Sequence, residues 1–208
     1  AYTDSNGKLN GTDTGAEELP YCLAEYFAGY WLRALDCYDI TQSEVRFAGH
    51  SMGGYVAQNC VKSFPEMFKG IILLNSTPFA DSPEKREDRK RGIDLILSAK
   101  LGHLASLSIP KMYAPSNLRK FDEKIEETVE ITETHDPNGI VASIKGMMER
   151  VETKEVLSKT EKVMLVFGTE DKFITEETRG KLISEFPDAK SVVIPDTGHN
   201  SFIEAPEK

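Results

Sequence analysis

One segment, residues 45–64, limits the possible folds of this chain more than any other. Residues 45–48 form a short strand candidate, and the sequence Gly-His-Ser-Met-Gly follows at 49–53. Apolar side chains then recur every three or four residues up to Pro65, which predicts an amphipathic helix that this proline ends. A strand that runs into a glycine-flanked serine and leaves it as a helix is typical of a sharp strand-to-helix turn.

Strand-like and helix-like segments alternate on both sides of this turn. Residues 71–75 form a continuous apolar run, which predicts a strand buried on both faces. Residues 163–167 and 191–194 predict two more strands, and helices are expected over residues 20–36 and from Thr175. This alternation predicts an α/β fold with a mostly parallel sheet and flanking helices.

Residues 79–151 interrupt the alternation, because they contain helical periodicities and no strand-like apolar run. We therefore expect a helical insertion that divides the core into residues 1–78 and 152–208. Within the insertion, residues 84–91 are eight consecutive charged residues. This run predicts a solvated helix face, with a site for an anionic partner as the alternative.

The composition excludes several classes of protein. The chain has 208 residues, of which 39% are hydrophobic, as in ordinary globular domains. A net charge of −9 argues against a nucleic-acid partner, which would need a basic face. No apolar run approaches the ~18 residues needed to span a membrane. The three cysteines cannot all pair and have no metal-ligand spacing, which indicates a reducing, cytoplasmic compartment. No metal or organic cofactor is implied.

Ser51 is the candidate nucleophile. A serine at the apex of a strand-to-helix turn is held in strained backbone angles, and we expect no room for a Cβ at Gly49 and Gly53. The helix that follows directs its first N–H groups toward the reacting oxygen. The alternative is an incidental serine in a glycine-rich helix start.

A serine hydroxyl needs a base that accepts its proton, and histidine is the usual one. Of the four histidines, His199 follows the last predicted strand, at the edge where α/β sheets gather their active groups. His50 precedes the serine on the opposite side of the strand and is not expected to reach it. His103 and His135 are expected to be exposed on the insertion. We therefore predict His199 as the base.

The third member is a carboxylate that orients the base. Glu170 and Asp171 follow the strand that ends at Gly168, and adjacent residues cannot both face the imidazole. Asp171 is preferred, since it is far enough into the loop to turn back toward the centre. Asp196 is the alternative, but it lies on the same loop as His199 and is expected to form a turn.

Three motifs at strand ends occur in a characteristic order. They are Gly-His-Ser-Met-Gly-Gly from Gly49, Gly-Thr-Glu-Asp from Gly168 and Thr-Gly-His-Asn from Thr197. In this order they resemble the α/β-hydrolase superfamily. Residues 73–82 and the sequence Phe-Ile-Glu-Ala-Pro-Glu at 202–207 resemble its bacterial esterase-like serine hydrolases, which carry a helical lid.

The resemblance covers about residues 20–208 and implies a role for each motif. Ser51 would be the nucleophile, His199 the base and Asp171 the residue that orients it. The backbone N–H of Met52 would donate one hydrogen bond to the oxyanion, and the helical insertion would be the lid.

The sequence departs from this family at its N-terminal end. The family has a strand that ends in His-Gly upstream of the nucleophile, and the loop after it supplies the second oxyanion N–H. Residues 1–18 are expected to be a loop without a strand, and no histidine precedes His50. We therefore expect the C-terminal part of a longer hydrolase, or a homologue whose partner or dimer mate completes the sheet beside the nucleophile strand.

These observations predict a serine hydrolase that cleaves a carboxylic ester or a similar small acyl substrate through an acyl-enzyme. The partner is a small molecule, not a nucleic acid or a membrane. The alternative is a non-catalytic ligand-binding homologue, or an inactive fragment that lacks the second oxyanion donor. In the insertion, Met112, Met147 and Met148 line an apolar pocket or simply pack the helices. Cys60 is expected to be a buried, inert thiol.

Overall fold

The computed structural model describes residues 2–3, 9–10 and 45–208. The predicted helix over residues 20–36 lies outside the described residues. In the part of the chain that is described, no helix is both long enough and apolar enough to cross a membrane.

Two short strands lie near the start of the chain. β1 (Tyr2–Thr3) and β2 (Leu9–Asn10) pair antiparallel and form a sheet of their own. The prediction that residues 1–18 contain no strand is therefore wrong. Strands of two residues are too short to show the alternating pattern by which a sequence reveals a strand.

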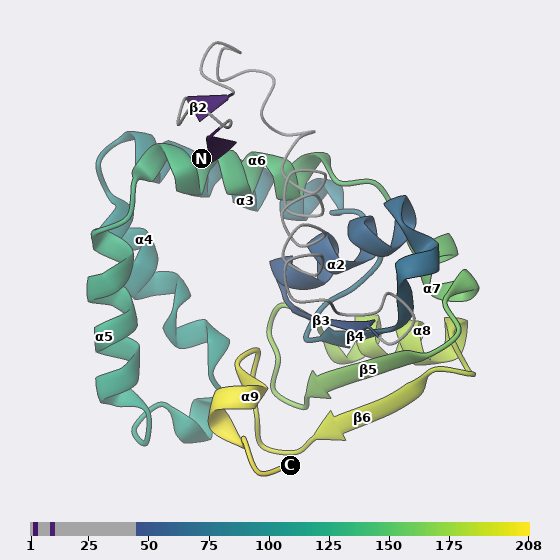
Figure 1. Ribbon diagram of the computed structural model, residues 1–208. Coiled ribbons are helices and arrows are strands. Elements are labelled where there is room, and N and C mark those ends of the chain that lie inside the picture. The colour runs from purple at the N-terminus through teal and green to yellow at the C-terminus, as the bar shows by residue number, and fades with distance from the viewer. Residues whose placement is uncertain (1, 4–8, 11–44) are drawn as a thin grey trace.

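The main sheet has four parallel strands in the order β3-β4-β5-β6 (Figure 1). Their bounds are β3 (Val45–His50), β4 (Phe68–Leu74), β5 (Val163–Gly168) and β6 (Lys190–Ile194). The predicted α/β class with a parallel sheet and flanking helices is correct. Each strand is longer than its predicted apolar run. β3, for example, continues through Gly49 and His50, which pair with Leu73 and Leu74 of β4.

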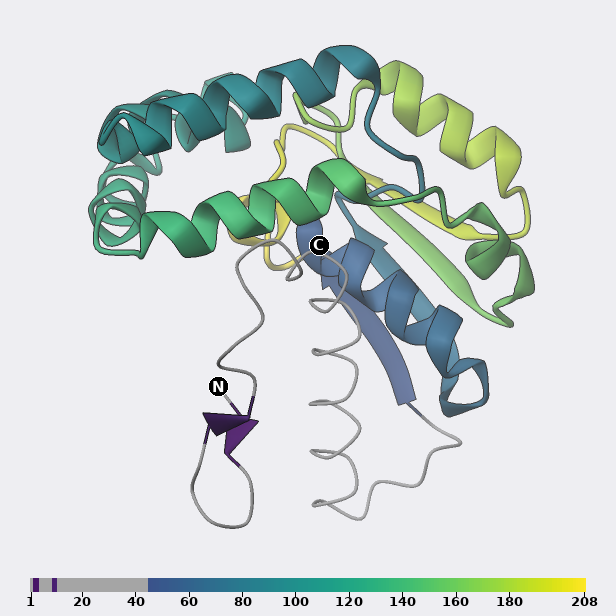
Figure 2. The same cartoon turned by 90° about the horizontal axis from the view of Figure 1, so that it is seen from above.

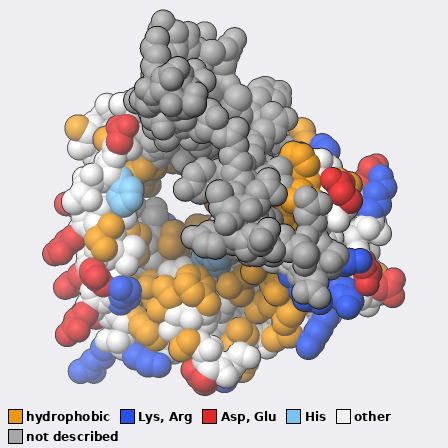
Figure 3. Space-filling view, in the orientation of Figure 1, with side chains coloured by type: hydrophobic (Ala, Val, Ile, Leu, Met, Phe, Trp, Pro, Cys, Tyr) orange, Lys and Arg blue, Asp and Glu red, His pale blue; other side chains and the backbone are white. Residues whose placement is uncertain are grey.

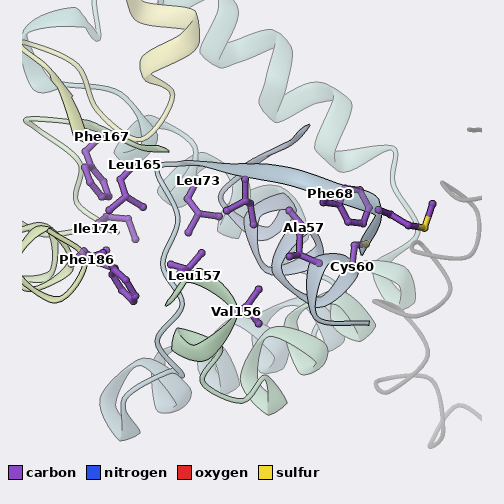
Figure 4. Close-up of a cluster of buried hydrophobic side chains, with 14 residues drawn as sticks. Ala57, Cys60, Phe68, Leu73, Val156, Leu157, Leu165, Phe167, Ile174 and Phe186 are labelled. Carbon is purple, nitrogen blue, oxygen red and sulfur yellow. The ribbon is translucent and has the colours of Figure 1, made fainter. Parts of the chain in front are cut away.

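Among the described residues, three helices cover one face of this sheet. They are α2 (Met52–Ser63), α7 (Lys154–Lys159) and α8 (Glu176–Glu185). Alternate residues of β4 and β5 point into this layer and build the largest buried cluster with helix residues such as Ala57 and Leu182 (Figure 4). α2 ends at Ser63, just before the 3-10 turn η2 (Pro65–Met67).

The opposite face is less completely covered. Ile72 and Leu74 are half-buried there, around a small cluster of Val166, Ile194 and Ala205. The prediction of a strand buried on both faces is therefore wrong for these two residues of β4. Among the described residues, a short C-terminal segment at Ala205 packs on this face, whereas whole helices pack on the other.

Four helices lie between β4 and α7, and the described residues there include no strand. They are α3 (Pro83–Leu97), α4 (Leu101–Ser108), α5 (Asp122–Glu133) and α6 (Pro137–Glu149). α3 and α6 run side by side, and α4 and α5 lie at their far end (Figures 1 and 2). Between α4 and α5 the chain passes close to the short helix α9 (Ser201–Glu204) through the 3-10 turns η3 (Pro110–Met112) and η4 (Pro115–Asn117). The division of the chain at residues 78 and 151 stays a prediction.

Local sequence signals explain where two of these helices begin. Ser82 caps α3 by accepting a hydrogen bond from the backbone N–H of Lys85, and Asp136 caps α6 in the same way from Asn138. A proline follows each cap, where its missing N–H costs nothing. The helices then bury their own apolar clusters, one of which joins Ile96 of α3 to Val141 of α6.

The two ends of the insertion are joined by a buried ion-pair network. The carboxylate of Asp81 is fully buried and accepts hydrogen bonds from Arg89 Nε at 2.6 Å and Arg150 Nη1 at 2.8 Å. Arg150 also donates to the carbonyl of Phe79 at 3.0 Å and stacks on the ring of Tyr55. Arg89 belongs to the run 84–91, which is otherwise largely exposed. The predicted solvated face is therefore correct for most of this run but not for Arg89 and Lys85, which are half-buried.

We expect Asp81→Asn to lower the free energy of unfolding by about 3 kcal/mol at pH 7, because it leaves two guanidinium groups unpaired in a buried site. Urea denaturation measures this. The matched control is Asp88→Asn, which removes an exposed partner of Arg91 and should cost less than about 1 kcal/mol. Equal losses in the two variants would contradict the interpretation.

The same variant should show a defined pH dependence. Burial by itself would raise the pKa of Asp81, but the hydrogen bond from Arg89 and the charges of Arg150 and Arg89 outweigh it and hold the pKa below its ordinary value of 3.8. The stabilisation is therefore fully present above that value and is lost as the pH falls through the lower folded-state pKa. The difference in unfolding free energy between parent and Asp81→Asn should shrink only below about pH 4.

Candidate active site

Three side chains from three strand ends meet at one edge of the sheet. Ser51 directly follows β3, Asp171 follows β5, and His199 follows β6. Because all four strands are parallel, their carboxyl ends lie at the same edge, which is where open α/β sheets carry their sites.

The turn at Ser51 has the backbone strain expected from the sequence. Ser51 has φ of 51° and ψ of −118°, a positive φ that non-glycine residues rarely adopt. Its N–H donates to the carbonyl of Leu74 at 3.0 Å, and its carbonyl accepts from Ser76 Oγ at 2.7 Å. These bonds to β4 and to the loop after it hold the strained residue in place.

The glycines around Ser51 are not equivalent. A Cβ at Gly49 would lie 2.3 Å from the carbonyl oxygen of Gly53, and one at Gly54 would lie 2.2 Å from Ser76 Oγ. A Cβ at Gly53 would meet nothing within 4 Å. The prediction that Gly53 has no room for a Cβ is therefore wrong. The second sterically required glycine is Gly54, since that residue packs against the loop after β4.

We expect Gly49→Ala and Gly54→Ala to destabilise the protein by about 1–3 kcal/mol, because backbone or packed side-chain atoms must move. Gly53→Ala should be neutral or stabilising by about 0.5 kcal/mol, since alanine favours a helix over glycine. Thermal unfolding distinguishes the three variants. A Gly53→Ala protein that is destabilised as much as Gly49→Ala would contradict this assignment of the glycines.

The three predicted side chains form one hydrogen-bonded chain. His199 Nε2 lies 2.8 Å from Ser51 Oγ, and His199 Nδ1 lies 2.9 Å from Asp171 Oδ2. An ionised carboxylate only accepts hydrogen bonds, so Nδ1 carries the proton and Nε2 is free to accept one from Ser51. His199 is 4% exposed and Asp171 is 6% exposed, so water competes little for these bonds.

Asp171 is held in its ionised form. Burial raises the pKa of this carboxyl, but hydrogen bonds and the charge of His199, together with hydrogen bonds from Asn75 and Ile174, outweigh burial and place the pKa below its ordinary value. Its Oδ1 accepts from the backbone N–H of Phe173 at 2.7 Å and of Ile174 at 3.1 Å.

The loop that carries His199 is fixed by Glu204, a residue to which the sequence reasoning assigned no role. The buried Glu204 carboxylate accepts hydrogen bonds from the backbone N–H of Gly198 at 2.6 Å and of Ala114 at 2.8 Å. It also accepts one from Asn117 Nδ2 at 2.8 Å. Glu204 thereby joins the loop that carries His199 to the insertion. The available sequence signal was its place in the motif at residues 202–207.

A family model described as the α/β hydrolase fold matches residues 20–206 of the chain. The chain belongs to the α/β-hydrolase family. It is similar to the structure of a thermophilic esterase from Thermogutta terrifontis, with 28% identity and a TM-score of 0.78 over 88% of this chain and 68% of that one.

Two curated proteins are also similar to this α/β hydrolase. A chloroplastic pheophytinase of Arabidopsis thaliana is 25% identical over 81% of the chain. A pimeloyl-acyl-carrier-protein methyl ester esterase of Yersinia enterocolitica is 23% identical over 76% of the chain. The chain spans 40% of the length of the first relative and 64% of the second.

The other three histidines of this α/β hydrolase are His50, His103 and His135. His103 and His135 are exposed, as predicted. His50 does not bond to Ser51, but its Nε2–H donates to the backbone carbonyl of His199 at 2.8 Å. Burial lowers the pKa of His50, and the nearby His199 lowers it further against the effect of that hydrogen bond. His50 therefore ties β3 to the loop that carries His199 as a neutral imidazole.

The alternative carboxylates lie elsewhere. Glu170 is exposed, and its N–H donates to the carbonyl of Thr197. Asp196 is exposed with φ of 58°, which is the turn conformation expected for it. Among the described residues, no group of three or more His, Cys, Asp or Glu side chains is placed to hold a metal ion.

The methionines of the insertion take part in its packing. Met112 packs on the cluster around Tyr113, and Met148 on the cluster around Ile93. The sulfur of Met147 lies 3.4 Å from Arg89 Nη1. Of the two alternatives left by the sequence, helix packing accounts for these contacts.

Proposed function

We propose that the protein is a serine hydrolase that cleaves a carboxylic ester, or a similar small acyl substrate, through an acyl-enzyme. The observation that carries this proposal is the unbroken hydrogen-bonded chain from Ser51 through His199 to Asp171. A hydroxyl within 2.8 Å of an imidazole nitrogen that can accept its proton is the arrangement nucleophilic catalysis requires.

Each side chain then has a defined task. Ser51 Oγ attacks the substrate carbonyl while His199 Nε2 takes its proton. His199 returns this proton to the leaving alcohol, and the ester bond breaks to leave an acyl group on Ser51. A water molecule, deprotonated by His199, hydrolyses the acyl-enzyme. Asp171 holds the imidazole in the required tautomer and stabilises its cationic form during both steps.

The negative charge that develops on the substrate oxygen needs N–H donors. Met52 is the first residue of α2, and the N–H groups of a first helical turn have no acceptor within the helix. We assign its N–H as one oxyanion donor. The second donor is expected from the segment upstream of β3, and β3 pairs only with β4 among the described strands. Preceding chain or a second copy of the protein would complete the sheet at that edge.

The surroundings of the site favour an apolar acyl or alcohol group. The ring of Phe173 lies 4.7 Å from the His199 ring, and the ring of Phe202 lies 4.8 Å from His50. Met52 and Phe202 are 41% and 45% exposed, so both are open to a ligand. Figure 3 shows this face of the molecule hollowed beside the insertion, with hydrophobic side chains along the hollow. We propose a small or medium ester that binds between the sheet edge and the insertion, which acts as its lid.

The relatives are consistent with this substrate class, since two of them are named esterases.

The competing proposal is a ligand-binding homologue, or an inactive fragment, without the second oxyanion donor. The hydrogen-bonded triad favours the enzyme, because a protein that only binds its ligand has no need to hold a serine against an imidazole nitrogen. We also propose a cytoplasmic location. The described cysteine, Cys60, is a buried free thiol whose pKa burial raises to about 11.

We expect the protein to hydrolyse short-chain aryl esters and Ser51→Ala to reduce kcat by at least about 10³-fold. A fluorophosphonate probe should label the parent at Ser51 and leave Ser51→Ala unlabelled, with the site of labelling read by mass spectrometry. Ser106→Ala is the matched control, since among the described residues its hydroxyl bonds only to the carbonyl of Gly102 on an exposed face of α4. Ligand binding without turnover or labelling would favour the non-catalytic alternative.

A further inference from the structure

Asn75 lies between the nucleophile and the acid, and the hydrolytic mechanism above does not use it. It is the first residue after β4 and is fully buried. Its backbone N–H donates to the carbonyl of Val166 in β5 at 2.8 Å, and its φ is 47°. Asparagine tolerates this left-handed conformation better than most residues. The backbone therefore directs the amide side chain from a fixed point at the sheet edge.

Every polar group of this amide has a partner. Asn75 Nδ2 donates to Asp171 Oδ2 at 2.9 Å and to the carbonyl of Gly198 at 3.3 Å. Its Oδ1 accepts from Ser201 Oγ at 2.6 Å. Ser201 is also fully buried, and it lies two residues after His199. The Asp171 carboxylate and the Gly198 carbonyl only accept hydrogen bonds, so the NH₂ group must face them. The amide oxygen then faces Ser201, whose hydroxyl donates to it.

Asn75 donates its hydrogen bond to the same oxygen of Asp171 that accepts one from His199. Oδ2 accepts from both Asn75 Nδ2 and His199 Nδ1, whereas Oδ1 accepts from backbone N–H groups. Asn75 thus fixes the rotation of the Asp171 carboxylate. Its N–H also interacts with the negative charge of Oδ2, which would otherwise act on His199 alone. Glycine or alanine at this position could not do either.

We propose that Asn75 is a positioning residue for the acid of the triad, and that the Ser201 hydroxyl holds the oxygen of its amide in place. The inference rests on the proposed function. Asn75 holds Asp171 Oδ2 where it meets the imidazole and moderates the charge that this oxygen presents. Loss of the amide therefore has two consequences, a lower rate of proton transfer and a stronger stabilisation of the cationic imidazole.

The test is steady-state ester hydrolysis as a function of pH. We expect Asn75→Ala to lower kcat by about 10- to 100-fold with KM within about two-fold, since the amide acts on the triad and not on the bound ester. The acidic limb of kcat/KM should move to higher pH by about half a unit, because Asp171 Oδ2 keeps only one donor. Ser201→Ala removes only the hydroxyl that holds the amide oxygen, and should change kcat and the pH profile in the same direction but by less. Asn59→Ala, whose amide bonds to the Tyr55 carbonyl, is the matched control.

The charged and titratable groups that act on Asp171 remain in place in these variants. They are His199, His50, Tyr55 and Lys85. A moved acidic limb therefore reports on the bond between Asn75 and Asp171. Loss of folded protein is followed separately by thermal unfolding, and Ser201→Ala keeps the inference testable if Asn75→Ala does not fold.

A double-mutant cycle separates a positioning role from a structural one. Asp171→Asn alone should cost about 10⁴-fold in kcat. In that background, Asn75→Ala should cost less than about two-fold more, since the group it positions is gone. Full additivity of the two losses, or an unmoved pH profile in Asn75→Ala and Ser201→Ala, would overturn the inference. A parent protein that neither hydrolyses esters nor reacts at Ser51 would instead overturn the proposed function.

Discussion

The parallel register of β3, β4, β5 and β6 is the constraint on which the site depends. Beyond the end of β3, β4 and β5, the first N–H of the loop donates to a carbonyl of the neighbouring strand. These bonds run from Ser51 to Leu74 at 3.0 Å, from Asn75 to Val166 at 2.8 Å and from Thr169 to Ile194 at 3.1 Å. The hydrogen-bond ladder of the sheet thus continues into the loops that carry the residues of the site. Side chains from distant parts of the sequence are therefore placed as accurately as the sheet itself.

The insertion is attached to this frame at two separate places. Asp81, Arg89 and Arg150 join its two ends beside α2, and Glu204 joins residues 114–117 to the loop of His199. Both attachments use a buried carboxylate with several donors, which is strong when complete and costly when one partner is lost. A helical segment fixed in this way defines one wall of the proposed substrate site and also supports the base.

Much of this arrangement could be predicted from the sequence, because the relevant signals are local. The serine between a strand and a helix, and the carboxylate and histidine after later strands, each follow from a short pattern. Other features depend on contacts between distant segments. Gly53 and Gly54 are adjacent in the sequence, yet only the position of Ser76 shows which of them lacks room for a Cβ. Asn75 and Glu204 likewise have partners 96 and 90 residues away, which no local pattern reveals.

The sequence by itself determined the fold class, the helical nature of residues 79–151 and the candidates Ser51, Asp171 and His199. It did so because hydrophobic period and turn chemistry act over a few residues. The tertiary structure decided which polar groups share an atom. Asp171 Oδ2 has two donors from two different loops, and the rotation of that carboxylate is set only when β4, β5 and β6 lie side by side. The parallel sheet supplies that proximity, and it is a property of the assembled fold.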